Sequence, residues 1–187
     1  MRYKHPLIIY ELDGVLADCA IREAEAGAAG SCHGKGSLVY WQTLFDPHRL
    51  KQDLLVDKGR DLVHQLWKDN VHQIILTKRP LSLTRNSFFH EVYNVTMAWC
   101  LEQGLMPGWF RTWTFRERRG QSEALWKPEQ VYLYVGKHAE VDHLYVVDKN
   151  EENRYAIGYL CHELYLGIDL LDDIQALEAA LRLDKEV

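Results

Sequence analysis

The chain has 187 residues and a mass of 21.9 kDa, which suits one domain spanning residues 1–187 with at most a small insert. Apolar residues make up 47% and charged residues 26%, a balance that excludes a disordered or fibrous chain. The formal net charge is -5, which excludes a basic protein that coats duplex nucleic acid, so any nucleic-acid contact must be local.

Three short apolar runs predict buried parallel strands, and each run ends in polar residues. They are residues 6–10, followed by Glu11 and Asp13, residues 71–76, followed by Thr77, and residues 143–147, followed by Asp148. Two weaker strands are predicted at residues 109–115 and 161–166. Two neighbouring parallel strands must be joined by a crossover segment that returns the chain to the other end of the sheet.

Segments with helical period supply those crossovers. They cover residues 58–69, 83–103, 128–137, 151–160 and 170–183, and Gly104 closes the second of them. The alternation predicts an α/β fold with a doubly wound parallel sheet, a Rossmann-like three-layer sandwich. Ligands of such sheets bind beyond the carboxyl ends of the central strands, so the polar residues that follow the three strands should converge on one crevice.

The first strand and the following helix are separated by an expected insert at about residues 19–55. Residues 25–37 are rich in glycine and predict a mobile loop. Residues 38–45 are aromatic and apolar, so the insert could form a small lid over the strand ends. Its aromatic residues could cap a base or pack onto the main core.

The amphipathic helix at residues 170–183 is expected to cover the sheet. An exposed apolar stripe on it would instead provide a surface for a homodimer or a protein partner.

The sequence contains no sign of a membrane span, a disulfide framework or a zinc motif. No segment approaches the ~18 apolar residues of a span, and the first apolar run is too short for a signal peptide. The cysteines form no CxxC pair and the histidines no HExxH or paired ligand spacing, so we expect reduced thiols and no zinc site. We therefore predict a cytoplasmic protein without membrane contact.

Glu11 and Asp13 follow the first strand at a spacing of two residues, in the string PLIIYELDGVLAD. In an extended chain this spacing places both carboxylates on the same side. There they could hold a divalent cation, or act as a nucleophile and a general acid in phosphoryl chemistry. For such a pair taken alone, a strand that ends in a solvated acidic turn is the commoner interpretation.

The string ELDGVLAD resembles motif I of the haloacid dehalogenase (HAD) superfamily, DxDG followed by Thr or Val, and three later motifs follow in the family's order. Thr77 in IILTKRP matches motif II, Lys127 in LWKPEQV motif III and Asp148 in LYVVDKNEEN motif IV. The string DGVLAD, the helix with Trp99 and the Arg-Gly string at residues 116–120 are similar to phage-type members and to the phosphatase half of polynucleotide kinase. The resemblance covers residues 6 to about 166 and implies an HAD-like fold.

The resemblance also implies hydrolysis of a phosphate monoester, in a nucleotide or at a polynucleotide end, and a role for each matched residue. Glu11 would stand in the place of the nucleophile and Asp13 in that of the acid and base. Thr77 and Lys127 would bind the transferring phosphoryl group. Mg2+ would be held by Glu11, Asp148 and the backbone carbonyl of Asp13. These roles suit phosphoryl transfer, which depends on positioning and on compensation of oxygen charge.

Three residues depart from the family pattern. Glu11 replaces the nucleophilic Asp, and a displacement of about 1 Å can cost on the order of a hundredfold in rate. Lys149 stands where a second motif IV acid is usual, which should weaken Mg2+ binding. Lys78 stands where Gly often follows the motif II Thr, so Lys78 and the next residue, Arg79, are candidate substrate contacts. Each departure is also tolerable, because Glu can ligate Mg2+, motif IV acids vary and Lys78 could point to solvent.

Residues 111–119, RTWTFRERR, alternate cations with aromatic side chains, as in contacts to phosphates and stacked bases. The alternative, which we favour for Trp113 and Phe115, is an edge strand with buried aromatic residues and solvated arginines. The resemblance implies an arginine near the substrate phosphate here, so Arg116 is a candidate substrate contact, with Arg118 as the alternate.

Two functions from different classes follow. The first is a Mg2+-dependent phosphomonoesterase, impaired by Glu11, that acts on a phosphorylated small molecule or a nucleic-acid end. The second is a pseudo-phosphatase that binds a ligand or a protein partner through the crevice or the C-terminal helix. A third possibility is a phosphatase whose nucleophile was deliberately substituted.

Overall fold

The computed structural model describes residues 4–31, 37–81, 88–116 and 122–186. Within these residues five parallel strands form one sheet in the order β5-β4-β1-β6-β7. They are β1 (Pro6–Tyr10), β4 (His72–Pro80), β5 (Thr112–Arg116), β6 (His143–Val147) and β7 (Gly167–Leu171). The chain starts in the centre of the sheet and extends it first on one side and then on the other, which is the doubly wound topology.

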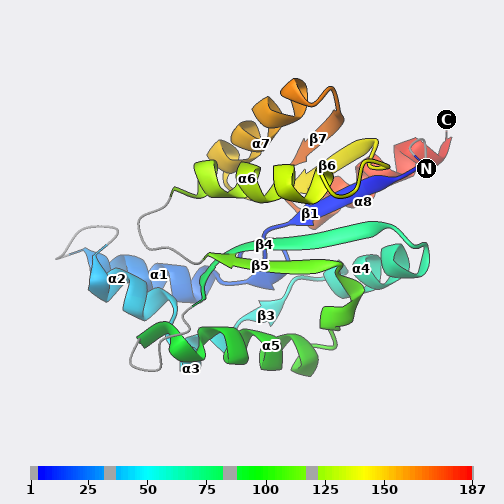
Figure 1. The fold of residues 1–187 in the computed structure, drawn as a ribbon. Coiled ribbons are helices and arrows are strands. Elements are labelled where there is room, and N and C mark those ends of the chain that lie inside the picture. The colour runs from blue at the N-terminus through cyan, green and yellow to red at the C-terminus, as the bar shows by residue number, and fades with distance from the viewer. Residues whose placement is uncertain (1–3, 32–36, 82–87, 117–121, 187) are drawn as a thin grey trace.

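Helices cover both faces of the sheet (Figure 1). One face packs against α4 (Gly59–Lys68), α5 (Val92–Glu102) and α8 (Ile174–Glu186), and the other against α6 (Glu123–Val135) and α7 (Glu151–Glu163). Along β1, Ile8 and Tyr10 belong to the first core, and Leu7 and Ile9 to the second. Both faces of the strand are therefore buried, which explains its continuous apolar run. The predicted α/β fold is confirmed.

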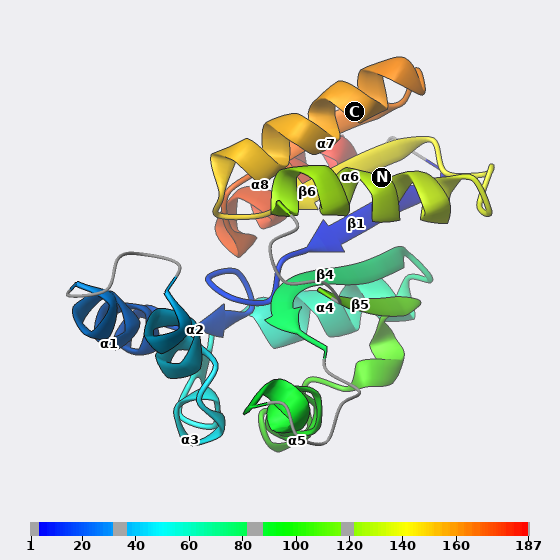
Figure 2. The ribbon, with the colours of Figure 1, turned by 60° about the vertical axis from the view of Figure 1, so that its left-hand side comes forward.

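The segment between residues 17 and 55 leaves the sheet and returns to it. A short antiparallel pair, β2 (Ala17–Asp18) and β3 (Leu54–Leu55), closes its base. Between these strands lie α1 (Ala20–Gly30), α2 (Leu38–Leu44) and α3 (Pro47–Leu50), which stand beside the sheet in Figure 2. We call residues 17–55 the insert. Its small core, with Ala26, Leu44 and Phe45, also includes Phe89 and Val92, so the insert packs on the start of α5.

The prediction of a mobile loop at residues 25–37 is wrong for its first part. Residues 25–30 continue α1, whose alanines favour a helix, while residues 32–36 lie outside the described residues. A Cβ at Gly30 would lie 3.1 Å from the ring of Tyr40 in α2. The small residues therefore let two helices of the insert pack closely, a use of glycine that the sequence pattern does not distinguish from a loop.

The strand predicted at residues 161–166 is also wrong. Helix α7 continues to Glu163, and the chain turns at Tyr165, where φ is 57°, before β7 begins at Gly167. Residues 170–171 consequently belong to β7 rather than to the last helix. That helix, α8, buries Leu177 against the sheet, as expected of a helix that covers it.

Two other helices differ from the prediction at their starts. Helix α6 begins at Glu123 rather than at residue 128, so Lys127 lies inside a helix. Of the helix predicted at residues 83–103, residues 82–87 lie outside the described part of the chain, and a 3-10 turn at Phe88–Glu91 precedes α5. Gly104 follows α5 with a φ of 71°, which supports its predicted role as the stop signal.

Strand β5 lies at an edge of the sheet. Phe115 is buried in it and Trp113 packs against the main core, which confirms the interpretation of these two aromatic residues as packing residues. Among the described residues, no helix has both the length and the apolar character that crossing a membrane requires.

We expect Phe45→Ala to lower the free energy of unfolding by about 3–5 kcal/mol, because it removes a buried ring from the insert's core. Chemical denaturation followed by circular dichroism measures this change. Leu38→Ala, at an exposed position of the same insert, is the control and should change stability by less than about 0.5 kcal/mol. Equal effects of the two substitutions would contradict a core inside the insert.

Candidate active site

Polar side chains from the three central strands meet at the carboxyl edge of the sheet. Glu11 directly follows β1, Thr77 lies inside β4 and Asp148 directly follows β6. These strands are neighbours in the sheet, and all three residues are buried. The ammonium group of Lys127 reaches the same point from α6 and contacts both Glu11 and Asp148. The structure thus brings these four predicted site residues together, with Asp13 on the same loop as Glu11.

The carboxylate of Glu11 is surrounded by N–H donors. Its Oε1 accepts hydrogen bonds from the backbone N–H groups of Leu12 at 2.9 Å and Asp13 at 3.3 Å. Its Oε2 accepts from the backbone N–H of Lys78 at 3.3 Å and from Nζ of Lys127 at 2.5 Å. Converging N–H groups and an ammonium form an anion-binding site. Glu11 folds back over its own loop and occupies that site with its own carboxylate.

Lys127 bridges the two carboxylates that would bind a metal ion. Its Nζ lies 2.5 Å from Oε2 of Glu11 and 2.5 Å from Oδ2 of Asp148, and Nδ2 of Asn153 also donates to Asp148 at 3.0 Å. Burial disfavours its charge, but the two carboxylates outweigh burial and raise the pKa of Lys127 above its ordinary value. Lys127 therefore remains an ammonium ion at neutral pH.

The two carboxylates have the oxygen ligands that Mg2+ prefers. The ammonium of Lys127 lies between them, however, so a Mg2+ ion bound to both would have to displace it. Burial raises the pKa of Glu11, and the charge of Lys127 offsets only part of that rise. Glu11 and Asp148 thus offer the type of ligand that Mg2+ binds. The positive charge that the metal would bring is already supplied by Lys127.

Asp13 is held by two arginines. Its Oδ1 accepts hydrogen bonds from Arg79 at 2.6 Å, at the end of β4, and from Arg22 at 2.8 Å, in α1 of the insert. Both guanidinium groups also donate to Oδ2 of Asp53 at 2.9 Å, so two arginines and two aspartates form one buried cluster. Burial alone would raise the pKa of Asp13, but the two arginines lower it below its ordinary range. Asp13 is therefore an ionised hydrogen-bond acceptor with no proton to donate.

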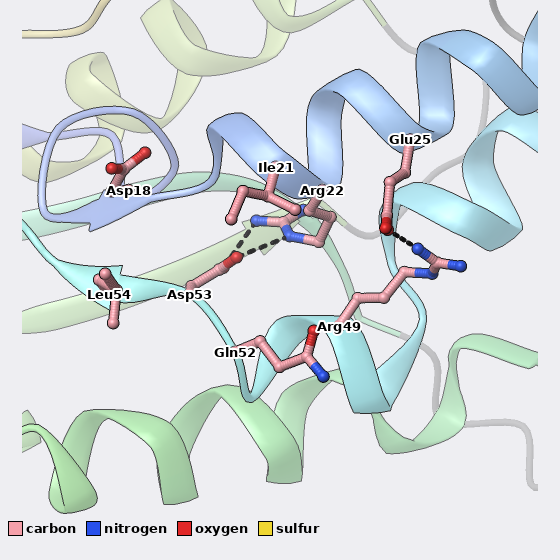
Figure 3. A pocket seen from close by; sticks show the side chains of 8 residues that line it. All are labelled: Asp18, Ile21, Arg22, Glu25, Arg49, Gln52, Asp53 and Leu54. Atoms are coloured by element: carbon pink, nitrogen blue, oxygen red, sulfur yellow. Dashed lines mark hydrogen bonds and ion pairs between the residues drawn. The ribbon is translucent and has the colours of Figure 1, made fainter.

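Charged side chains join the insert to the site, as Figure 3 shows for a small pocket beside the cluster. Arg22 points from α1 to Asp53, just before β3, and Glu25 of the same helix pairs with Arg49 of α3. These pairs fix α1 against the chain that returns to the sheet. The contact between Arg22 and Asp13 consequently depends on the position of the whole insert.

The expected substrate contacts Lys78 and Arg79 are both engaged with protein groups. Nζ of Lys78 donates to Oε1 of Glu23 in the insert at 3.1 Å. Arg79 is fully buried, and besides the two aspartates it donates to Oγ1 of Thr96 at 3.1 Å. Its backbone N–H donates to Oγ1 of Thr77 at 3.3 Å. The structure thus places Arg79 in the cluster that holds Asp13 rather than on the surface of a crevice.

Arg116, the third expected substrate contact, also lies against the insert. Its guanidinium is 5.0 Å from the ring centroid of Trp41 in α2 and 3.9 Å from Oε1 of Glu123 in α6. This stacking is a cation–π contact between the end of β5 and the insert. The alternate, Arg118, lies outside the described residues.

A larger cavity, of about 440 Å³, opens beside the site between the first loop, the insert and Lys149. Among the described residues, its charged lining consists of three carboxylates, from Asp18, Glu23 and Asp57, and the ammonium of Lys149. Gly14, with a φ of 81°, lies against Lys149, and a Cβ there would be 3.2 Å from its Cδ. The excess of negative charge makes this cavity unfavourable for a polyanion.

The sequence patterns do not identify Arg22, Asp53 and Asn153 as site residues. Arg22 and Asp53 lie in the segment expected to be an insert, and no spacing rule connects them to Asp13. Asn153 lies in the first turn of α7, inside the quoted motif IV string, and its amide nitrogen donates to Asp148. A polar residue facing back from the helix that follows a motif strand is the signal that could have identified it.

Solved structures with a similar fold include HAD-type hydrolases. The chain superposes on an HAD-like family hydrolase from Streptococcus pneumoniae with a TM-score of 0.61 and 11% identity, covering 96% of this chain and 98% of that one. For a predicted phosphoglycolate phosphatase from Haemophilus somnus the TM-score is 0.56 and the identity 11%, and the match covers 92% of this chain and 88% of that one. For an HAD-superfamily hydrolase from Ehrlichia chaffeensis the TM-score is 0.54 and the identity 10%, and the match covers 97% of this chain and 96% of that one.

These similarities show that the chain has an HAD-like fold, as its motifs implied. No protein-family model matches the chain, and no curated protein matches it.

We expect Asp13→Asn to lower the free energy of unfolding by about 3–5 kcal/mol, because it breaks buried ion pairs with Arg22 and Arg79. Folding lowers the pKa of Asp13 below its unfolded value of about 3.9. The ion pairs of Asp13 therefore stabilise the fold fully above that unfolded pKa, and this contribution is lost only as the pH falls through the lower pKa of the folded state. The difference from the wild type should persist at about pH 4. Urea unfolding at pH 7 and pH 4 measures it.

The exposed Asp172→Asn is the control for this substitution and should leave stability within about 0.5 kcal/mol. A difference between wild type and Asp13→Asn that disappears at about pH 4 would show that the arginines do not keep Asp13 ionised.

Lys127→Met leaves two buried carboxylates without their cation, so we expect a loss of about 3–5 kcal/mol in the absence of divalent ions. Mg2+ should restore part of this stability, because it can replace the ammonium between Glu11 and Asp148. Thermal unfolding with MgCl2, or with NaCl at equal ionic strength, measures the effect. The exposed Lys137→Met is the control. If Mg2+ raises the Tm of wild type and Lys127→Met equally, Lys127 and Mg2+ do not compete.

Proposed function

We propose that this protein is an HAD-type, Mg2+-dependent phosphomonoesterase with impaired turnover. One observation carries the proposal: the carboxylate of Glu11 lies at the end of the central strand, with Nζ of Lys127 and the backbone N–H of Lys78 within hydrogen-bond reach. This is a carboxylate nucleophile beside donors that can compensate phosphoryl charge.

In the proposed reaction an oxygen of Glu11 attacks phosphorus while the bond from phosphorus to the leaving oxygen breaks. The acyl phosphate formed on Glu11 is then hydrolysed by water, which releases phosphate and restores the carboxylate. Lys127, the N–H of Lys78 and the hydroxyl of Thr77 stabilise the charge on the phosphoryl oxygens. Mg2+ held by Glu11, Asp148 and the carbonyl of Asp13 would supply further compensation of that charge.

Two features of the site impair this reaction. The carboxylate of Glu11 must leave the N–H groups that hold it before a phosphoryl group can take its place. The leaving oxygen must gain a proton, and Asp13, paired with Arg22 and Arg79, has none to give. Esters whose leaving group needs no proton should therefore be the better substrates.

We propose a small phosphorylated molecule, rather than a nucleic-acid end, as the substrate. The cavity beside the site has three carboxylates and one ammonium in its lining, which repel a polyanion and leave room for a small uncharged or cationic group. A polynucleotide end is supported by the resemblance alone, through the string DGVLAD, the helix with Trp99 and the Arg-Gly string at residues 116–120.

A pseudo-phosphatase is the second candidate, favoured by the charge balance of the site. Asp13 is matched by two arginines, and Lys127 stands between Glu11 and Asp148, so the protein itself neutralises the site. Such a protein would bind a ligand in the crevice, or a protein partner or second copy through α8.

We also place the protein in the cytoplasm. Cys19, Cys100 and Cys161 are buried free thiols, which suits a reducing compartment.

We expect Glu11→Asp to release phosphate from p-nitrophenyl phosphate at least about tenfold faster than the wild type in the presence of Mg2+. The shorter side chain cannot fold back as far, and about 1 Å in the position of a nucleophile is worth up to a hundredfold in rate. This ester has a good leaving group, so its attack by Glu11 does not need the proton that Asp13 lacks. An alkyl phosphate assayed in parallel should remain slow, because its leaving group needs a proton.

The control variant is Glu102→Asp, the same change at an exposed position of α5. A gain in Glu11→Asp that is abolished by adding Lys127→Ala supports the phosphomonoesterase. If neither the wild type nor Glu11→Asp releases phosphate, and calorimetry detects no Mg2+ binding, the phosphomonoesterase proposal is overturned in favour of the pseudo-phosphatase.

A further inference from the structure

A second group of metal-ligating side chains lies away from the candidate active site. A ring nitrogen of His72, a ring nitrogen of His138 and a carboxylate oxygen of Glu140 all lie within 4.8 Å of one another. His72 opens β4, and the other two follow α6, at the edge of the sheet away from α1–α3 in Figure 1. Five residues of strand, at about 3.3 Å each, put roughly 17 Å between His72 and Thr77. The cluster is therefore separate from the site at the carboxyl edge.

The two imidazole rings are held in place by Tyr134. Its ring stacks on that of His138, with centroids 4.3 Å apart and planes at 28°, and meets the ring of His72 edge-on at 6.4 Å. Its hydroxyl lies 3.4 Å from Nδ1 of His72. A hydrogen bond at one ring nitrogen orients a histidine for metal binding through the other. The rings are thus positioned by neighbouring side chains before any ion binds.

The spacing of two of these groups already matches a metal site. Nδ1 of His138 lies 3.2 Å from Oε1 of Glu140. Ligands at about 2.0–2.2 Å from a tetrahedral ion are separated from one another by about 3.3–3.6 Å. Because a carboxylate oxygen only accepts, a hydrogen bond at this contact needs the ring proton on Nδ1. An ion would take the place of that proton.

The kind of ligand selects the ion. Two imidazole nitrogens and one carboxylate oxygen suit Zn2+, whereas Mg2+ prefers oxygen ligands alone. Three protein ligands leave the fourth tetrahedral position to water.

We propose that His72, His138 and Glu140 bind one Zn2+ ion. The ion connects the start of β4 to the turn between α6 and β6, so its binding stabilises the amino edge of the sheet. The sequence does not predict this site, because His72 lies far from the other two ligands along the chain and the three form no zinc motif.

Calorimetric titration of the EDTA-treated full chain with ZnCl2 tests the proposal. We expect one ion to bind with a Kd on the order of micromolar or tighter, and His138→Ala and Glu140→Gln each to weaken binding at least about tenfold. Co2+ bound in place of Zn2+ should give the intense visible absorption of a tetrahedral site, and both variants should lose it. Zn2+ should also raise the Tm of the wild type more than that of the variants.

The matched controls are His162→Ala and Glu163→Gln, at exposed positions of α7. They should bind Zn2+ as the wild type does. Glu140 is exposed, so Glu140→Gln keeps the test valid if a histidine variant misfolds. Equal Zn2+ affinity in the wild type and both site variants, or no binding by the wild type at millimolar Zn2+, overturns the proposal. Neither result depends on phosphatase activity.

Discussion

Four carboxylates buried at one edge of the sheet must be neutralised, and the rest of the site follows from this constraint. Glu11, Asp13, Asp53 and Asp148 are each at most 4% exposed. Each buried charge costs several kcal/mol unless it is paired and hydrogen-bonded. The chain supplies Lys127 to one pair of carboxylates, and Arg22 and Arg79 to the other. Stability therefore requires three cations at the place proposed for a phosphate ester and a metal ion.

This compensation makes the insert part of the site. Arg22 reaches Asp13 from α1, Glu23 pairs with Lys78, and Trp41 packs against Arg116. Each contact links a residue at the edge of the sheet to a helix of the insert. Movement of the insert would consequently break the buried ion pair between Arg22 and Asp13 and the partly exposed pair between Lys78 and Glu23, and would uncover Lys78 and Arg116. The same contacts that hold the insert in place also restrain the groups proposed for catalysis.

The two edges of the sheet have different chemistry. Carboxylates and their cations collect at the carboxyl edge, because the three central strands end there and loops carry their polar residues. At the amino edge, imidazole and phenol rings pack together around Tyr134. About five residues of strand separate the two groups, so a change at one edge can leave the other intact. One small sheet thus carries oxygen ligands, the kind that hard ions prefer, at one edge, and at the other edge the nitrogen ligands that softer ions prefer.

The sequence by itself determined the α/β class, the strands β1, β4, β5 and β6, and the meeting of Glu11, Thr77 and Asp148 at one edge of the sheet. The resemblance to motif III added Lys127 to them. Runs buried on both faces have a local signature, and parallel strands necessarily bring their carboxyl ends to one edge. It misjudged residues 25–30 and 161–166, where small or mixed residues fit more than one local structure. Only the tertiary structure decided the partners of Asp13, the folding back of Glu11 and the cluster at His72. These depend on which side chains from distant segments come within about 3 Å of one another, and neither periodicity nor spacing encodes that distance.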